Sequence, residues 1–197
     1  LSNAIGQGEV LLTPIQLANM TATIANRGWY YTPHIIKEID GKPIKDKRFI
    51  KKHHTTIDPE NFEPVVEGMH QVYKNGTASS LQIEGIEIAG KTGTAENFVR
   101  VNGKRMQLTD HSIFVAFAPV DNPKIAIAVF VENGYWGGRY GGKIASLMIE
   151  KYLKGKITRT DLEDFIMDPK NSLEDEYEKP YSGEPFLIND GKKNGWL

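Results

Sequence analysis

The stretch "SIFVAFAPVDNPKIAIAVFVE", residues 112–132, predicts a hairpin of two strands joined at "VDN". Side chains alternate between the faces of a strand, and both faces of the first strand are apolar: Ile113, Val115 and Phe117 on one, Phe114, Ala116 and Ala118 on the other. A sheet that is apolar on both faces has to be covered on both. We therefore expect an α/β fold in which helices cover an antiparallel sheet on both faces.

Three segments, residues 13–28, 58–76 and 141–155, have helical spacing and end signals. Thr-Pro and Asp-Pro open the first two, and a glycine follows the end of each. The first carries one apolar stripe of Leu17, Met20 and Ile24. The second has apolar residues at helical spacing: Phe62, Val65, Val66, Met69, Val72 and Tyr73. In the third, apolar residues cover most of the circumference, so we expect it to be largely buried: Ile144, Ala145, Leu147, Met148, Ile149, Tyr152 and Leu153.

Residues 85–95 are a third strand candidate, and the weaker segments 30–40 and 47–52 predict a peripheral hairpin around Gly41. After Gly155 the chain becomes acidic and rich in Pro and Gly. We expect residues 1–155 to be the folded part, and residues 156–197 to be an extended tail with one short helix within 157–167.

Composition excludes several classes of function. The chain has 197 residues, enough for one domain with a core, and its net charge of −1 gives no reason to expect nucleic acid or an anionic membrane as partner. It has no cysteine, which excludes disulfides, thiolate catalysis and cysteine zinc sites. No apolar run is long enough to span a bilayer. The start "LSNAIGQGEV" has neither an initiator Met nor a leader, and we expect it to lie within a longer protein.

The stretch "GIEIAGKTGTAENF", residues 85–98, contains two motifs that need different backbones. From Gly85 it matches a phosphate-binding loop, which requires a flexible loop followed by a helix starting at Lys91-Thr92. The four residues after Gly85 include two isoleucines and favour an extended chain, and Gly93 opposes a helix. The residues therefore favour the second motif, K-T-G-T on a strand.

On such a strand each residue has a role that chemistry can use. Lys91 places a positive charge beside a nucleophile and a substrate carboxylate, and Thr92 and Thr94 offer hydroxyls to that carboxylate. Gly93 leaves room for a substrate backbone, and the Thr94 amide can face a developing oxyanion. The alternative for Lys91 is a charge that protects an edge strand from aggregation.

With these residues the sequence resembles the class B penicillin-binding proteins, for which K-T-G is part of the known signature. "AIGQGEVLLTPIQLANMTATIANRG" (4–28), "AGKTGTAE" (89–96), "HSIFVAFAPVDNPKIAIAVFVENG" (111–134) and "GGKIASLMIEKYL" (141–153) follow the family's order. The Gly-Gln-Gly form resembles the elongation-type branch of penicillin-binding protein 2. The resemblance covers about residues 4–155 and makes them the C-terminal portion of a transpeptidase domain, the half that carries K-T-G.

The resemblance implies a peptidoglycan D,D-transpeptidase, an enzyme of cell-wall synthesis and cell shape. A serine attacks the D-Ala-D-Ala bond of a stem peptide, and the amine of a neighbouring strand releases the acyl-enzyme. Expected ligands are stem peptides and β-lactams, without metal or cofactor. A glycosyltransferase is a candidate partner. The implied location is the periplasmic face of the bacterial inner membrane, reached through an N-terminal anchor outside this chain.

The family's S-x-x-K and S-x-N motifs do not occur, since no serine here has Lys three positions on or Asn two positions on. In the family both precede the Gly-Gln-Gly segment. We therefore expect the chain to be inactive alone, to need the missing N-terminal part of the same protein, and to self-associate through exposed apolar surface and a sheet edge. The alternatives are part of a class D β-lactamase or β-lactam sensor, or a non-catalytic binding module that keeps the cleft wall.

Other polar clusters carry weaker signals. In the loop "NGYWGGRYGG", residues 133–142, Tyr135, Trp136 and Tyr140 could pack on a peptide and Arg139 could meet a carboxylate, or the loop is only a flexible connection. "DHS", residues 110–112, suggests a triad, but adjacent residues on a strand point to opposite faces, and we interpret it as the entry to the hairpin. We interpret His53 and His54 as solvated surface. Residues 96–110 are a polar excursion that is either a lid or a partner surface.

Overall fold

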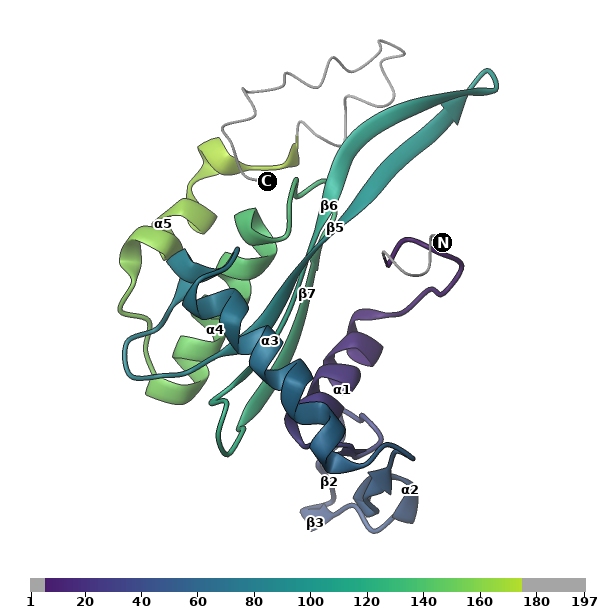
Figure 1. The fold of residues 1–197 in the computed structure, drawn as a ribbon, viewed down its shortest axis with the longest axis vertical. Helices are drawn as coiled ribbons and strands as arrows, with labels where there is room; N and C mark the ends of the chain where they lie inside the picture. Colours follow the sequence, from purple (N-terminus) through teal and green to yellow (C-terminus); the bar gives the residue numbers. More distant parts are fainter. Residues whose placement is uncertain (1–5, 175–197) are drawn as a thin grey trace.

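The computed structural model describes residues 6–174. Its centre is an antiparallel sheet in the order β5-β6-β7, made of β5 (Ala89–Val101), β6 (Lys104–Ala118) and β7 (Ile125–Val131) (Figure 1). The predicted hairpin is confirmed, since Ser112 pairs with Val131 and Ala118 with Ile125. The third strand is also confirmed, although it begins at Ala89 and not at residue 85.

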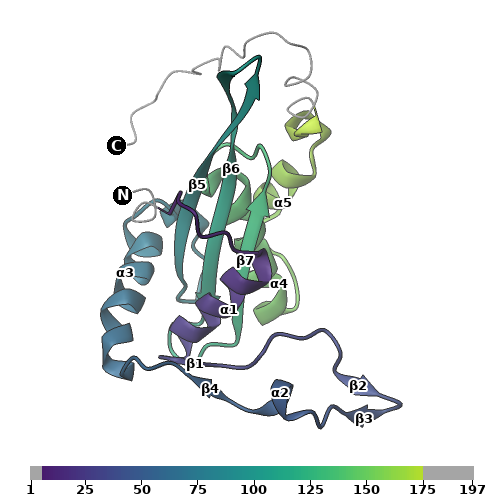
Figure 2. The same ribbon diagram turned by 90° about the vertical axis from the view of Figure 1, so that its right-hand side faces the viewer.

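Helices cover both faces of this sheet, as expected (Figure 2). α1 (Pro14–Ala25) lies on one face, α4 (Lys143–Lys154) on the other, and α3 (Glu63–Lys74) runs beside β5. Each face has its own buried core. The core on the α4 side contains Tyr73, Leu81, Phe114, Ala116, Ala118 and Ile149. The core on the α1 side contains Ala25, Val66, Met69, Ala89 and Phe117.

The start of α1 was predicted correctly, its end was placed too late, and its apolar stripe is confirmed only in part, because Leu17 and Ile24 are half-buried and Ile24 packs against the core. The Thr13 N–H donates to Gln16 Oε1 at 2.8 Å, an N-terminal cap before Pro14. The helix ends at Ala25, before Arg27 and Gly28 adopt positive φ values of 56° and 103°. Its buried residues are Thr21 and Ala25, whereas Met20 of the predicted stripe is 44% exposed. Small side chains face the core because they let the helix lie close to the sheet.

α3 follows the 3₁₀ turn Pro59–Phe62, and it buries Val66, Met69 and Tyr73 but leaves Val65 exposed. α4 is less buried than predicted, since Met148 and Tyr152 are exposed. A helix on the outside of a sheet needs only one buried stripe, and the outer side of α4 is partly covered by α5 (Thr160–Met167).

The peripheral segment contains β1 (Trp29–Tyr30) paired with β4 (His53–His54), and β2 (Glu38–Ile39) paired with β3 (Lys42–Pro43). A hairpin around Gly41 is thus confirmed, but its second strand is Lys42–Pro43 and not the predicted segment 47–52. The predicted strand at 47–52 is wrong, because Lys47–Ile50 form the short helix α2. Asp46 caps α2 by accepting the Arg48 N–H at 2.9 Å.

The polar excursion 96–110 continues β5 and β6 outward as a two-stranded arm (Figure 1). Its tip is Asn102-Gly103, where both residues have positive φ, 51° and 77°. An Asn-Gly pair favours this tight hairpin turn, because both positions need the left-handed conformation.

α5 lies within the short helix expected at 157–167, and the turn Pro169–Asn171 follows it. Tyr140 Oη donates to the Asn171 carbonyl at 2.9 Å. The part of the chain that packs on the domain therefore extends past residue 155, the predicted end of the folded part. The rest of the predicted tail, from residue 175, lies outside the described residues. Within residues 6–174, no helix has both the length and the apolar character needed to cross a membrane.

Candidate active site

The backbone of Lys91–Thr94 is extended within β5, at an edge of the sheet, because among residues 6–174 the strand β5 pairs only with β6. Of the two motifs that overlap in residues 85–98, the extended backbone excludes the phosphate-binding loop, which would need a helix at this position. The Lys91 amine donates to the Thr92 carbonyl at 2.8 Å, and the Gln7 amide donates to the Thr94 carbonyl at 3.2 Å. Both acceptors lie outside the β5–β6 ladder.

The direction of the Thr94 amide N–H follows from these contacts. In an antiparallel strand, the N–H and C=O of one residue point to the same side. Since the carbonyls of Thr92 and Thr94 accept from side chains that do not belong to β6, we infer that their N–H groups also point away from β6, to the open edge. An amide in this position is available to a ligand that lies alongside β5.

Three hydroxyls gather on one face of this edge. Thr92 Oγ1 lies 3.1 Å from Thr77 Oγ1, and Thr94 Oγ1 accepts the Gly137 N–H at 3.3 Å. By alternation along the strand, Lys91 belongs to the opposite face, the α1 side. The lysine reaches the edge by turning its amine back to the Thr92 carbonyl.

The loop 133–142 lies directly over Gly93. A Cβ added to Gly137 would come within 2.5 Å of the Ile113 carbonyl oxygen and 2.6 Å of the Gly93 carbonyl oxygen. Only a glycine allows this approach of backbone to backbone. The structure thus brings the backbone of the loop that carries Tyr135, Trp136 and Arg139 onto the K-T-G strand at Gly137.

Residues 110–112 hold this loop in place. The buried Ser112 Oγ donates to the Trp136 carbonyl at 2.9 Å and accepts the Gly141 N–H at 3.0 Å. His111 Nδ1 accepts the Asn133 N–H at 3.1 Å, and the Asp110 carbonyl accepts the Tyr135 N–H at 2.9 Å. "DHS" is therefore a structural anchor and no triad. It lies within β6, and the prediction that it is the entry to the hairpin is confirmed, because the pairing of β6 with β7 begins at Ser112 and Val131.

The loop side chains form a cation–aromatic cluster. The Arg139 guanidinium lies 4.1 Å from the centre of the Tyr135 ring and 5.3 Å from that of Trp136. Trp136 is 56% exposed and open to a ligand. Tyr140 is buried and its hydroxyl is bound to Asn171, so the prediction that its ring packs on a peptide is wrong.

The prediction that His53 and His54 are solvated surface is confirmed for His54 but not for His53, which is half-buried. His53 stacks on Tyr30 with ring centres 5.2 Å apart, and its Nε2 lies 3.3 Å from Thr32 Oγ1. His54 is exposed. The two rings belong to neighbouring strand positions and do not share a ligand site.

Sequence reasoning missed Thr77 and Gln7 as neighbours of the site. Gln7 lies in the Gly-Gln-Gly segment, which was recognised as a family feature, but its position beside Thr94 was not predicted. Nothing local marks Thr77, because its contact with Thr92 depends on the turn between α3 and β5.

Comparison with known proteins places this geometry in a family. Residues 1–154 match the model of the penicillin binding protein transpeptidase domain. Peptidoglycan D,D-transpeptidase MrdA of Acinetobacter baumannii is 39% identical over 157 residues, which are 75% of this chain and 23% of the relative. MrdA of Haemophilus influenzae is 30% identical over 192 residues, 91% of this chain and 29% of the relative.

Comparison with solved structures supports the same family assignment. The crystal structure of Pseudomonas aeruginosa PBP2 in complex with WCK 5153 has a TM-score of 0.63 and 37% identity, and the match covers 81% of this chain and 34% of that one. A ceftriaxone acyl-enzyme complex of penicillin-binding protein A from M. tuberculosis also has a TM-score of 0.63, with 32% identity over 76% of this chain and 34% of that one. The chain thus spans between about a quarter and a third of these proteins. On its sequence and on its fold, this chain belongs to the penicillin-binding protein transpeptidase family.

Proposed function

We propose that this chain forms the K-T-G wall of the active site of a peptidoglycan D,D-transpeptidase. The observation that carries the proposal is the extended Lys91–Thr94 segment at the open edge of β5, with the hydroxyls of Thr77, Thr92 and Thr94 beside it. Relatives named D,D-transpeptidases support it, and their names do not favour a lactamase, a sensor or a non-catalytic module.

In the proposed reaction, a stem peptide lies along the open edge of β5 as an added strand. A serine from the missing N-terminal part attacks the carbonyl of the penultimate D-Ala and forms an acyl-enzyme, and D-Ala leaves. The Thr94 N–H stabilises the oxyanion. Thr92 and Thr94 bind the terminal carboxylate, and the positive charge of Lys91 strengthens this binding. The amine of a second stem peptide then attacks the ester and forms the cross-link.

Further contacts belong to the same proposal. Trp136, with Tyr135 and Arg139 behind it, borders the peptide beyond the K-T-G strand. β-Lactams occupy the same edge, a proposal supported by the ceftriaxone acyl-enzyme complex of a relative. The whole protein acts on the periplasmic side of the inner membrane, is held by an anchor outside this chain, and works beside a glycosyltransferase. The residues described here call for no metal or cofactor in this chemistry.

A fluorescent penicillin tests the proposal. We expect the complete protein to form a covalent adduct and the 197-residue chain alone to form none. Lys91→Ala in the complete protein should slow adduct formation by about 10²-fold, because the positioned charge beside the nucleophile and the ligand carboxylate is lost. Arg100→Ala, an exposed cation further out on β5, is the matched control and should leave the rate unchanged. No adduct on the complete protein, or a stoichiometric adduct on the chain alone, would contradict the proposal.

A further inference from the structure

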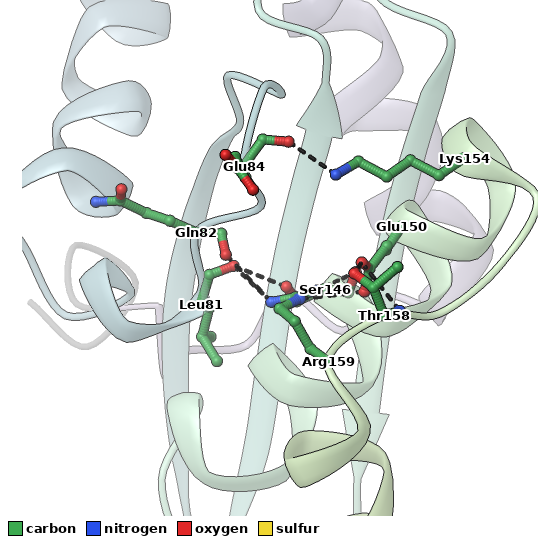
Figure 3. A network of polar contacts seen from close by, with 8 residues as sticks. All are labelled: Leu81, Gln82, Glu84, Ser146, Glu150, Lys154, Thr158 and Arg159. Carbon is green, nitrogen blue, oxygen red and sulfur yellow. Dashed lines mark hydrogen bonds and ion pairs between the residues drawn. The ribbon is translucent and has the colours of Figure 1, made fainter.

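A buried ion pair lies behind the site, between α4 and the start of α5 (Figure 3). The Glu150 side chain is fully buried, and Arg159 Nε donates to its Oε2 at 3.1 Å. The Thr158 N–H and hydroxyl donate to Oε1. Burial by itself raises the pKa of Glu150, but the hydrogen bonds from Thr158 and Arg159 outweigh it and lower that pKa. Glu150 therefore stays charged and holds Arg159.

The rest of the Arg159 guanidinium binds main-chain oxygens of two other segments. Nη1 donates to the carbonyls of Leu81 and Gln82 at 3.2 and 3.3 Å, and Nη2 donates to the Ser146 carbonyl at 3.1 Å. A guanidinium has five donors in a fixed plane, so one side chain can fix three segments at once. Figure 3 shows Arg159 between the Leu81–Gln82 turn and α4.

The Leu81–Gln82 turn leads back to the site. It ends the 3₁₀ turn Ser79–Leu81, which follows Thr77, the residue whose hydroxyl contacts Thr92. Ser146 Oγ donates to the same Leu81 carbonyl at 2.8 Å, and the Leu81 side chain is buried. Gln82 Nε2 donates to the Tyr73 carbonyl at 2.8 Å, which ties the turn to α3.

We propose that Arg159 is a positioning residue for the transpeptidase site: it clamps the Leu81–Gln82 turn against α4 and so fixes Thr77 beside Thr92. The inference rests on the proposed function. Arg159 does not touch the substrate, and it lies beyond residues 1–154 that the family model matches. The start of the C-terminal segment is thereby part of the machinery that shapes the K-T-G edge.

Arg159→Lys in the complete protein is the decisive variant. Lysine keeps a cation for Glu150 but lacks the planar fork that reaches the two turn carbonyls. The measured quantity is the acylation rate constant with a fluorescent penicillin, per titratable active site. We expect it to fall by about tenfold, because small displacements of positioning groups have large effects on rate. A purely structural role would lower the number of titratable sites but not the rate at each.

Arg27→Ala is the matched control. Arg27 is 21% exposed against 19% for Arg159, pairs with Glu63 at 2.9 Å and donates to the Ala25 carbonyl, but does not touch the turn. Its rate per site should stay within about twofold of wild type, since distant sites act independently. If Arg159→Lys does not fold, Ser146→Ala removes the other side-chain bond to the Leu81 carbonyl, and its rate per site should fall.

The outcomes separate the two proposals. A wild-type rate per site in Arg159→Lys, or in Ser146→Ala where that variant replaces it, overturns the positioning role while the proposed function stands. An equal fall in Arg159→Lys and Arg27→Ala also overturns it, because the effect is then one of general stability. If the complete wild-type protein forms no adduct, the proposed function fails and this inference fails with it.

Discussion

Gly137→Ala is the substitution for which the structure predicts the largest effect from the smallest chemical change. Gly137 has φ −54° and ψ −32°, a backbone that alanine adopts freely, so only the added methyl group matters. That methyl would lie 2.5 Å from the Ile113 carbonyl oxygen, 2.6 Å from the Gly93 carbonyl oxygen and 2.8 Å from the Gly93 nitrogen. All three are backbone atoms of the sheet and cannot rotate away.

The magnitude follows from the required movement. A normal contact between a methyl carbon and a carbonyl oxygen needs more than about 3 Å, so the loop has to rise by roughly half an ångström or more. Overpacking of this kind costs about 1–3 kcal/mol. Each kcal/mol lowers Tm by about 2–4 °C in a domain of about 150–250 residues, and by less in the larger complete protein. The same shift weakens the Gly137 N–H bond to Thr94 Oγ1, now 3.3 Å, and moves Trp136.

The assay compares Gly137→Ala with Gly138→Ala in the complete protein. At Gly138 the added methyl would have its nearest neighbour at 3.7 Å, the Thr77 carbonyl oxygen, which is an ordinary contact. We expect Gly137→Ala to lower both Tm and the rate of acylation by a fluorescent penicillin, and Gly138→Ala to change neither appreciably. Equal effects of the two variants, or a wild-type Gly137→Ala, would refute the inferred approach of this loop to Gly93.

Three further predictions use other parts of the chain. The pKa of Glu150 in the folded state lies below its ordinary value of 4.5, so the stabilisation by its charge is complete above about pH 4.5 and is lost as the pH falls through the folded-state pKa. The Tm difference between wild type and Glu150→Gln should therefore shrink as the pH is lowered below 4.5. A constant difference would contradict the assignment. Phe114→Ala removes a fully buried ring and should cost about 3–5 kcal/mol in urea unfolding, whereas Phe130→Ala, at a ring that is 41% exposed, should cost clearly less. Val10 and Leu11 are 69% and 90% exposed and the β5 edge is open, so we expect the isolated chain to self-associate. It should then elute earlier in size-exclusion chromatography as its concentration rises, and a constant monomer elution volume would argue against self-association.

Sequence signals were reliable where the deciding interactions lie within a few residues. Alternation in residues 112–132 predicted both strands, and the Thr13-Pro14 pair predicted the start of α1. The failures have one local and one tertiary cause. Asp46 is a local signal that was overlooked, since it caps the helix Lys47–Ile50 where a strand was predicted. Met20 and Tyr152 are exposed for a tertiary reason, because an apolar residue on a helix is buried only if another element covers it.

The sequence by itself predicted that Lys91–Thr94 is extended, because β-branched neighbours and Gly93 oppose a helix there, and the structure confirms it. Its resemblance to the transpeptidases is what suggested a site on this strand. Only the tertiary structure decided which groups share that site. Gln7 reaches Thr94 across 87 positions of sequence, Thr77 meets Thr92 through a turn, and Gly137 lies on Gly93. Such contacts depend on how the sheet and its helices pack, and packing is a property of the whole core that no local pattern encodes.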